Sequence, residues 1–199
     1  MVGSDIELSY RVPDDMQSQV IISIVLGFAT DPAMRWCWPD NDVYINTMPK
    51  WTMASGGKAF AAGTALYHNG CGALWLPPGV TPDEPMMESL ITETINPDLH
   101  DTLALLGEKL TPYQPHRQHW YLPLIGAEST ARGQGAGTAL MESVTRVCDE
   151  QMQLAYLMCS NPMNVGFYQR QGFEVMDEVR VKDFPLMIPM VRLPKKQHR

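Results

Sequence analysis

Apolar residues recur along the chain with two different spacings, which separate predicted helices from predicted strands. Apolar residues three and four apart predict a helix, and strict alternation with polar residues predicts a strand. Helices are expected at residues 13–28, 31–38, 40–57, 133–150 and 164–170. Strands are expected at residues 6–10, 62–67, 72–76, 118–127, 154–159, 173–179 and 186–193. Residues 77–117 are mostly helical in pattern, with breaks before Pro97 and Pro112.

Several residues mark where these elements begin, turn or bend. Asp31 and Asp40 stand where a carboxylate can cap the N-terminus of a helix. The pair Asn69-Gly70 is the turn signal of a hairpin. Pro123 lies inside the strongest predicted strand, at residues 118–127. Proline has no N–H to give to a sheet, so we expect an edge position or a bulge there.

The predicted helices and strands together indicate an α+β fold. No repeat, low-complexity tract or linker divides the chain, so a single domain is expected over residues 1–199. The helical segment at about 77–117 reads as an insertion between two strands that could be neighbours. It is either a wall or lid of a pocket, or a plain helical pair that covers the sheet.

The composition and net charge argue against nucleic acids and anionic membranes as general binding partners. The 199 residues include 15 Lys+Arg and 22 Asp+Glu, which gives a net charge of -7. General binding to nucleic acids or anionic membranes relies on Lys and Arg, so neither is expected. No apolar run reaches the length of a membrane helix, and the start lacks the pattern of a signal peptide, so a cytoplasmic location is expected.

The four cysteines and the five histidines show no spacing typical of a metal site, so no metal is expected. Free and mostly buried thiols are expected instead for Cys37, Cys71, Cys148 and Cys159.

The stretch from Arg132 to Thr138 is the first that indicates chemistry, because it follows a predicted strand and opens a predicted helix. Its three alternate glycines, Gly133, Gly135 and Gly137, let a ligand approach the backbone N–H groups at the positive end of the helix dipole. This arrangement suits a phosphate or pyrophosphate, with the Arg132 charge beside it. The sequence is neither a Walker A loop nor a dinucleotide fingerprint. A glycine-rich connection without a ligand is the other reading.

A second cluster lies about 24 residues further on, where a strand ends at Asn161 and a helix begins. Asn164 and Tyr168 are four residues apart, so both can meet one ligand from the same helix face. Two amides and a phenol supply hydrogen-bonding groups and a proton donor. The plainer alternative is a capping asparagine and a packed aromatic ring.

Together, in this order, the two clusters resemble the GNAT superfamily of N-acetyltransferases over residues 118–180. Arg132, Gly135 and Gly137 match its acyl-CoA loop. The downstream signature matches at Asn161, Asn164, Phe167, Tyr168, Gly172 and Phe173. The resemblance implies a mixed, mostly antiparallel, twisted sheet with splayed central strands, flanked by helices. It also implies acetyl-CoA as co-substrate and N-acetyl transfer to a primary amine by direct attack in a ternary complex.

The resemblance also implies roles for individual residues. Main-chain groups of the strand end would pair with the pantetheine arm, namely Ile125, Gly126 and Ala127. Main-chain N–H groups of the loop would hold the pyrophosphate, namely Gly133, Gln134, Gly135, Ala136, Gly137 and Thr138. Asn161 and Asn164 would contact the CoA arm, and Tyr168 would protonate the departing thiolate.

Several groups are candidates for the base that deprotonates the amine. Some GNAT enzymes carry an acidic residue where this chain has Tyr156. His119, Glu84 and Glu88 are candidates, and a water chain is another. The expected acceptor is a small-molecule or peptide amine, and a monomer or homodimer is expected. A non-catalytic acyl-CoA sensor with the same fold is the alternative function.

Overall fold

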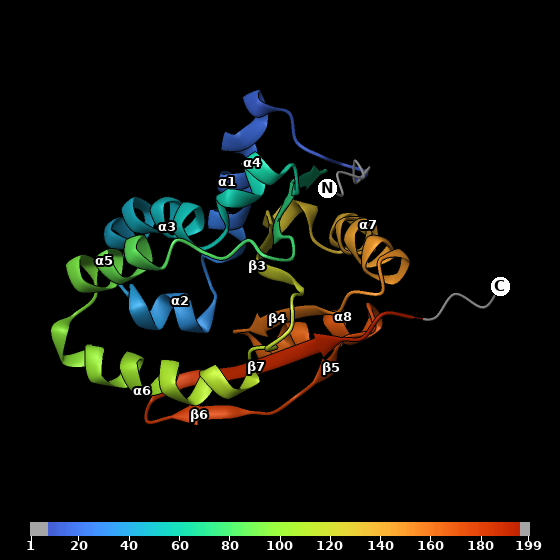
Figure 1. Ribbon diagram of the computed structural model, residues 1–199. Coiled ribbons are helices and arrows are strands. Elements are labelled where there is room, and N and C mark those ends of the chain that lie inside the picture. Colours follow the sequence, from blue (N-terminus) through green and yellow to red (C-terminus); the bar gives the residue numbers. More distant parts are fainter. Residues whose placement is uncertain (1–7, 196–199) are drawn as a thin grey trace.

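One seven-stranded sheet organises the computed structural model, which describes residues 8–195 (Figure 1). Its strands are β1 (Ala65–His68), β2 (Cys71–Leu76), β3 (Trp120–Ala127), β4 (Ala155–Cys159), β5 (Glu174–Val175), β6 (Val179–Val181) and β7 (Phe184–Arg192). The path through the sheet is β1-β2-β3-β4-β7-β5, and β6 also pairs with β7. Only β3 and β4 are parallel, so the predicted mixed, mostly antiparallel sheet is confirmed.

The described chain has eight helices, which surround the sheet (Figure 1). They are α1 (Gln17–Gly27), α2 (Pro32–Cys37), α3 (Asn41–Gly56), α4 (Lys58–Ala62), α5 (Glu84–Thr94), α6 (His100–Leu110), α7 (Ala136–Glu150) and α8 (Val165–Arg170). One core cluster joins α7 and α8 to the sheet, and a second joins α1, α2, α3 and α6 to it.

Capping aspartates fix where two of the helices begin, as predicted. The Asp31 carboxylate accepts hydrogen bonds from the N–H groups of Ala33 and Met34, at 3.0 and 3.1 Å. Asp40 does the same at the start of α3, where it accepts from Asp42 and Val43 at 2.9 and 3.0 Å. These bonds satisfy N–H groups that have no partner inside the helix.

Some predicted boundaries are wrong. Of the strand expected at 6–10, residues 6 and 7 lie outside the described residues, and the chain turns at 9–10 before Arg11 bridges to Leu66. The strand expected from residue 62 begins at Ala65, because Gly63 ends α4 in a left-handed conformation.

The strand expected at 173–179 is also wrong, because it is split into β5 and β6. Between them, the Asp177 carboxylate accepts from the Tyr113 hydroxyl and from the Glu178 N–H, at 2.7 Å for the latter. Such side-chain bonds compete with the ladder of a sheet and interrupt the strand.

The segment 77–117 has the predicted helical pattern. α5 and α6 are separated by a 3-10 turn at Pro97–Leu99, and a second turn follows at Thr111–Tyr113. α5 packs against α3, and α6 packs against β6. Across residues 8–195, no helix has the length and apolar character needed to cross a membrane.

The central strands β3 and β4 diverge. They pair only where Trp120–Leu122 faces Ala155–Leu157, and the described part of β3 beyond Leu122 has no partner on that side. On its other side, β3 has a bulge against β2: Leu74 faces Leu124 and Leu76 faces Tyr121, which leaves Pro123 inside the irregular step. The predicted bulge at Pro123 is therefore confirmed, and it lies where the two strands separate.

Candidate active site

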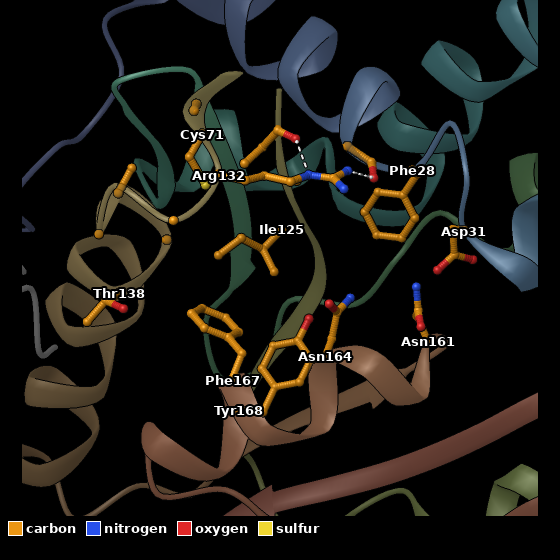
Figure 2. A pocket seen from close by; sticks show the side chains of 18 of the residues that line it. Phe28, Asp31, Cys71, Ile125, Arg132, Thr138, Asn161, Asn164, Phe167 and Tyr168 are labelled. Carbon is orange, nitrogen blue, oxygen red and sulfur yellow. Dashed lines mark hydrogen bonds between the residues drawn. The ribbon is translucent and has the colours of Figure 1, made fainter. Parts of the chain in front are cut away.

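A cavity of about 490 Å³ opens at the place where β3 and β4 diverge (Figure 2). Its walls come from the end of α1, the α1–α2 loop, the end of β3, the loop before α7, and α8. The lining residues are Gly27, Phe28, Thr30, Asp31, Cys71, Ile125, Gly126, Ala127, Ala131, Arg132, Gly133, Gly135, Ala136, Gly137, Thr138, Asn161, Asn164, Phe167, Tyr168 and Arg170. Every predicted site residue except Gln134 is among them.

The glycine loop forms one end of the cavity. Gly133 and Gly135 have φ angles of 76° and 85°, which a residue with a side chain rarely adopts. A Cβ at either position would meet nothing within 4 Å, so backbone conformation rather than crowding demands glycine there. Gly135 is the N-cap of α7. The free N–H groups in the first turn of α7, together with the helix dipole, make this end of the cavity suitable for an anion.

Two side chains of this loop bond to backbone carbonyls. The exposed Arg132 guanidinium donates to the Gly27 oxygen at 3.0 Å and to the Ala127 oxygen at 3.3 Å (Figure 2). Arg132 thereby ties the end of α1 to the end of β3. The Gln134 amide donates to the Thr130 oxygen at 2.6 Å and does not line the cavity, so only its backbone is near the place predicted for it.

The α8 wall contributes the second predicted cluster. The Asn161 side chain accepts from the Met163 N–H at 3.0 Å, and Asn164 is the residue before α8. Tyr168 is 8% exposed, and burial raises the pKa of its phenol well above its usual value. The nearby Cys159, Asp31 and Cys71 add to this rise in pKa. The phenol therefore keeps its proton at neutral pH and is able to donate it.

The wall formed by α1 and the α1–α2 loop was not predicted as part of the site. Gly27, Phe28, Thr30 and Asp31 reach the cavity because α1 lies directly on β3. In the sequence, Asp31 is recognisable only as a helix cap, and Asp40 carries the same signal without lining the cavity. Nothing in the sequence around Asp31 and Asp40 shows which of them lines the cavity.

A family model for the acetyltransferase (GNAT) domain matches residues 94–193, which is half of the chain. The chain belongs to the GNAT acetyltransferase family. The matched segment contains the glycine loop, both asparagines and Tyr168.

Solved structures show the same GNAT fold. A Corynebacterium glutamicum protein described as histone acetyltransferase HPA2 and related acetyltransferase is 18% identical, with a TM-score of 0.66 over 95% of this chain and 97% of that one. Arylalkylamine N-acetyltransferase 2 of Aedes aegypti is 14% identical, with a TM-score of 0.62 over 96% and 100% of the two chains. Drosophila melanogaster polyamine N-acetyltransferase is 14% identical, with a TM-score of 0.62 over 92% and 97%.

The three side chains considered as the base of this GNAT protein lie away from the cavity. Glu84 and Glu88 are exposed on α5, which packs against α3. His119 precedes β3, where its Nδ1 lies 2.8 Å from the Arg117 carbonyl and its ring meets that of Tyr156 edge to face. Tyr156 is buried outside the cavity, and its hydroxyl has no partner among the described residues.

All four cysteines are buried, as predicted. Cys71 lines the cavity, and burial raises its pKa to about 12. Burial likewise raises the pKa of Cys159 to about 11, although a hydrogen bond to the Asn161 backbone opposes the rise. Within residues 8–195, no three His, Cys, Asp or Glu side chains gather to form a possible metal site.

Proposed function

We propose that this protein transfers the acetyl group of acetyl-CoA to a primary amine by direct attack in a ternary complex. The observation that carries the proposal is that the glycine loop before α7 and the Tyr168 phenol line one cavity. An anion site at one end and a proton donor at the other match the two ends of a CoA thioester. Membership of the GNAT family supports the same assignment.

The lining residues fit CoA. Main-chain N–H groups from Gly133 to Thr138 would bind the pyrophosphate, because the loop leaves them open and the α7 dipole favours negative charge. Ile125, Gly126 and Ala127 lie on the unpaired side of β3 and would pair with the pantetheine arm as an added strand. Asn161 and Asn164 would contact the arm from the opposite wall.

The chemistry follows from what the protein must supply. A neutral amine attacks the thioester carbonyl while both substrates are held together, which removes much of the entropic cost of the encounter. A main-chain N–H near Ile125 would stabilise the oxyanion. Tyr168 would give its proton to the departing sulfur, because burial keeps that proton on the phenol.

The cysteines support direct attack over a covalent enzyme intermediate. A thiol needs to be a thiolate to act as a nucleophile. The cavity thiol of Cys71 has its pKa raised to about 12 by burial, so almost none of it ionises at neutral pH. The nearby Cys159 has a pKa of about 11 for the same main reason.

The amine acceptor is proposed from the resemblance and from the structural neighbours, two of which are described as arylalkylamine and polyamine N-acetyltransferases. The alternative is an acyl-CoA sensor without turnover. Tyr168 argues against that alternative, because a binding protein needs no proton donor beside the sulfur.

Thermal unfolding with acetyl-CoA, CoA, NAD and ATP tests the proposal first. A ligand that binds only the folded state raises its stability by about 2.7 kcal/mol at 100 times its dissociation constant. We expect both CoA species to raise the melting temperature, and NAD and ATP to leave it unchanged. Thiol release from acetyl-CoA in the presence of primary amines then separates the enzyme from the sensor. A protein whose melting temperature does not respond to CoA contradicts the proposal.

A further inference from the structure

The cavity contains one carboxylate among its described lining residues, that of Asp31. Its side chain is held from two distant parts of the chain. Oδ1 accepts from the N–H groups of Ala33 and Met34, and Oδ2 accepts from the Ser160 hydroxyl at 2.7 Å. Ser160 follows β4 and is 129 residues away in the sequence, so this contact joins the α1–α2 loop to the end of the central strand.

Capping a helix does not account for this placement. Asp40 caps α3 with the same pair of backbone hydrogen bonds while exposed to solvent. Asp31 is 5% exposed, so its charge is removed from water in addition. A buried charge costs free energy unless it is paired or hydrogen-bonded, and no Lys or Arg forms an ion pair with it among the described residues.

We infer that the Asp31 carboxylate is the base that takes the proton from the ammonium group of the acceptor, and that Ser160 is the residue that positions it. This inference rests on the proposed function. Figure 2 shows Asp31 and Tyr168 on different walls of one cavity. Oδ2 accepts a single hydrogen bond within the described chain, so one of its lone pairs is available to a donor from the cavity.

Two protons leave the nitrogen of the acceptor during the reaction. The ammonium group gives one proton to Asp31, which releases it to water. The neutral nitrogen forms its bond to the carbonyl carbon, the carbon–sulfur bond breaks, and the sulfur takes the Tyr168 proton. The nitrogen loses its second proton as the amide forms, and this proton restores the phenol. One proton therefore reaches solvent and one stays on the thiol of CoA.

The surroundings of Asp31 favour this role. Burial raises its pKa, although the hydrogen bonds from Ser160, Met34 and Ala33 oppose the rise. A base with a pKa closer to the working pH accepts a proton more readily. The negative charge of Asp31 in turn raises the pKa of four neighbouring groups. These are Cys37 of α2, Tyr44 of α3, Cys159 of β4 and Tyr168 of α8.

All four of these neighbours stay neutral at pH 7, because burial is the main cause that raises the pKa of each. A cation also faces this group: the Cζ of Arg35 lies 5.1 Å from the centroid of the Tyr44 ring. Asp31 is therefore the group whose ionisation sets the acid side of a pH profile.

Asp31→Asn tests the role with little change in shape, because the amide oxygen can still cap α2. Asp40→Asn is the matched control, since it alters the same kind of cap outside the cavity. The probes are 2-phenylethylamine, spermidine and a lysyl peptide, with thiol release from acetyl-CoA as the readout. We expect Asp31→Asn to lower kcat by about 10²- to 10⁴-fold at pH 7. Its melting temperature and its acetyl-CoA affinity should remain those of the Asp40→Asn variant.

The pH profile of kcat/KM separates a base from a structural residue. The wild type should show a plateau near neutrality, because Asp31 removes the proton from the bound ammonium. The kcat/KM of Asp31→Asn should rise about tenfold per pH unit below the pKa of the amine, which is about 10, since only the free amine can react. Ser160→Ala should shift the acid limb to higher pH, because its hydrogen bond lowers the pKa of Asp31.

The outcomes distinguish this inference from the proposed function. If acetyl-CoA does not bind, or if it binds and none of the three amines is acetylated, the proposed function fails and the assignment of Asp31 falls with it. If turnover occurs and Asp31→Asn keeps the wild-type rate and plateau, only the assignment of Asp31 is overturned.

Discussion

The backbones of Gly27 and Gly126 are in direct contact. A Cβ added to Gly27 would lie 2.7 Å from the Gly126 Cα, and one added to Gly126 would lie 2.7 Å from the Ile24 Cα. Helix α1 therefore lies on β3 without side chains between them, and this contact brings the α1–α2 loop to the cavity.

Gly126→Ala should destabilise the fold, because its methyl group would overlap the backbone of α1. We expect a loss of about 1–3 kcal/mol in the free energy of unfolding, measured by urea denaturation. Gly107→Ala is the control: Gly107 lies in α6 with nothing within 4 Å of its Cβ position, and alanine there should stabilise the protein by about 0.5–1 kcal/mol. Equal stability of Gly126→Ala and the wild type would contradict the close packing.

Gly135→Ala should weaken acetyl-CoA binding. The left-handed conformation costs an L-residue about 1–2 kcal/mol, so the loop would favour another shape and lose the alignment of its N–H groups. About a tenfold loss of affinity is expected from calorimetric titration. Gly79→Ala carries similar strain at an exposed turn outside the cavity, so it should reduce stability and leave affinity unchanged. Equal affinities of the two variants would exclude a role of the loop in binding.

Tyr168→Phe should lower kcat by about 10²-fold or more while acetyl-CoA affinity changes little, because the hydroxyl acts on the departing sulfur. Since burial raises the pKa of this phenol, kcat should not fall through ionisation of Tyr168 below about pH 10. Tyr156→Phe is the control. It also removes a buried hydroxyl, but that hydroxyl lies outside the cavity and has no hydrogen-bond partner among the described residues, so kcat should be unchanged. A parallel loss of kcat and affinity in Tyr168→Phe would indicate a binding role instead.

A buried ion pair ties the end of β7 to α7. Arg192, whose side chain is 3% exposed, donates to both oxygens of Asp149 at 2.7 Å. Asp149→Ala should cost about 3 kcal/mol in the free energy of unfolding, because it leaves a buried guanidinium without its partner. Glu178→Ala breaks the exposed pair with Arg180 and should change stability by less than about 1 kcal/mol.

The same pair predicts a dependence of stability on pH. Burial acts to raise the pKa of Asp149. Hydrogen bonds from Arg192 and from the Lys195 N–H, together with the positive charges of these two side chains, outweigh burial and lower the pKa below its ordinary value of 3.8. A carboxylate whose pKa is lowered by folding stabilises the native state above its unfolded pKa and loses that contribution as the pH falls through the folded value. The difference in stability between the wild type and Asp149→Asn should therefore be constant above about pH 5 and shrink below pH 4. A difference that is the same at pH 3 and pH 7 would contradict this assignment.

Local signals in the sequence were sufficient to locate most of the fold and one side of the candidate site. The caps at Asp31 and Asp40, the turn at Asn69-Gly70 and the glycines before α7 depend on interactions within a few residues, so they can be read from the chain itself. The two-residue strand β5 depends on its pairing with β7, and no local pattern sets its length.

The second side of the cavity could not be predicted for a related reason. The contacts that form it join residues far apart in the chain. Arg132 bonds to Gly27, 105 residues away, and Asp31 bonds to Ser160, 129 residues away. Each of these residues also has a plausible local role, so a single sequence does not show which of them meet.

The two walls of the cavity come from different portions of the sequence. The loop before α7 and helix α8 lie within residues 94–193, while Gly27, Phe28 and Asp31 precede that segment. Under the proposed function, the later portion determines how the acyl donor is held and the earlier portion determines which amine can approach it. Changes in the α1–α2 loop could therefore redirect the enzyme to a new acceptor while its dependence on the donor stays the same.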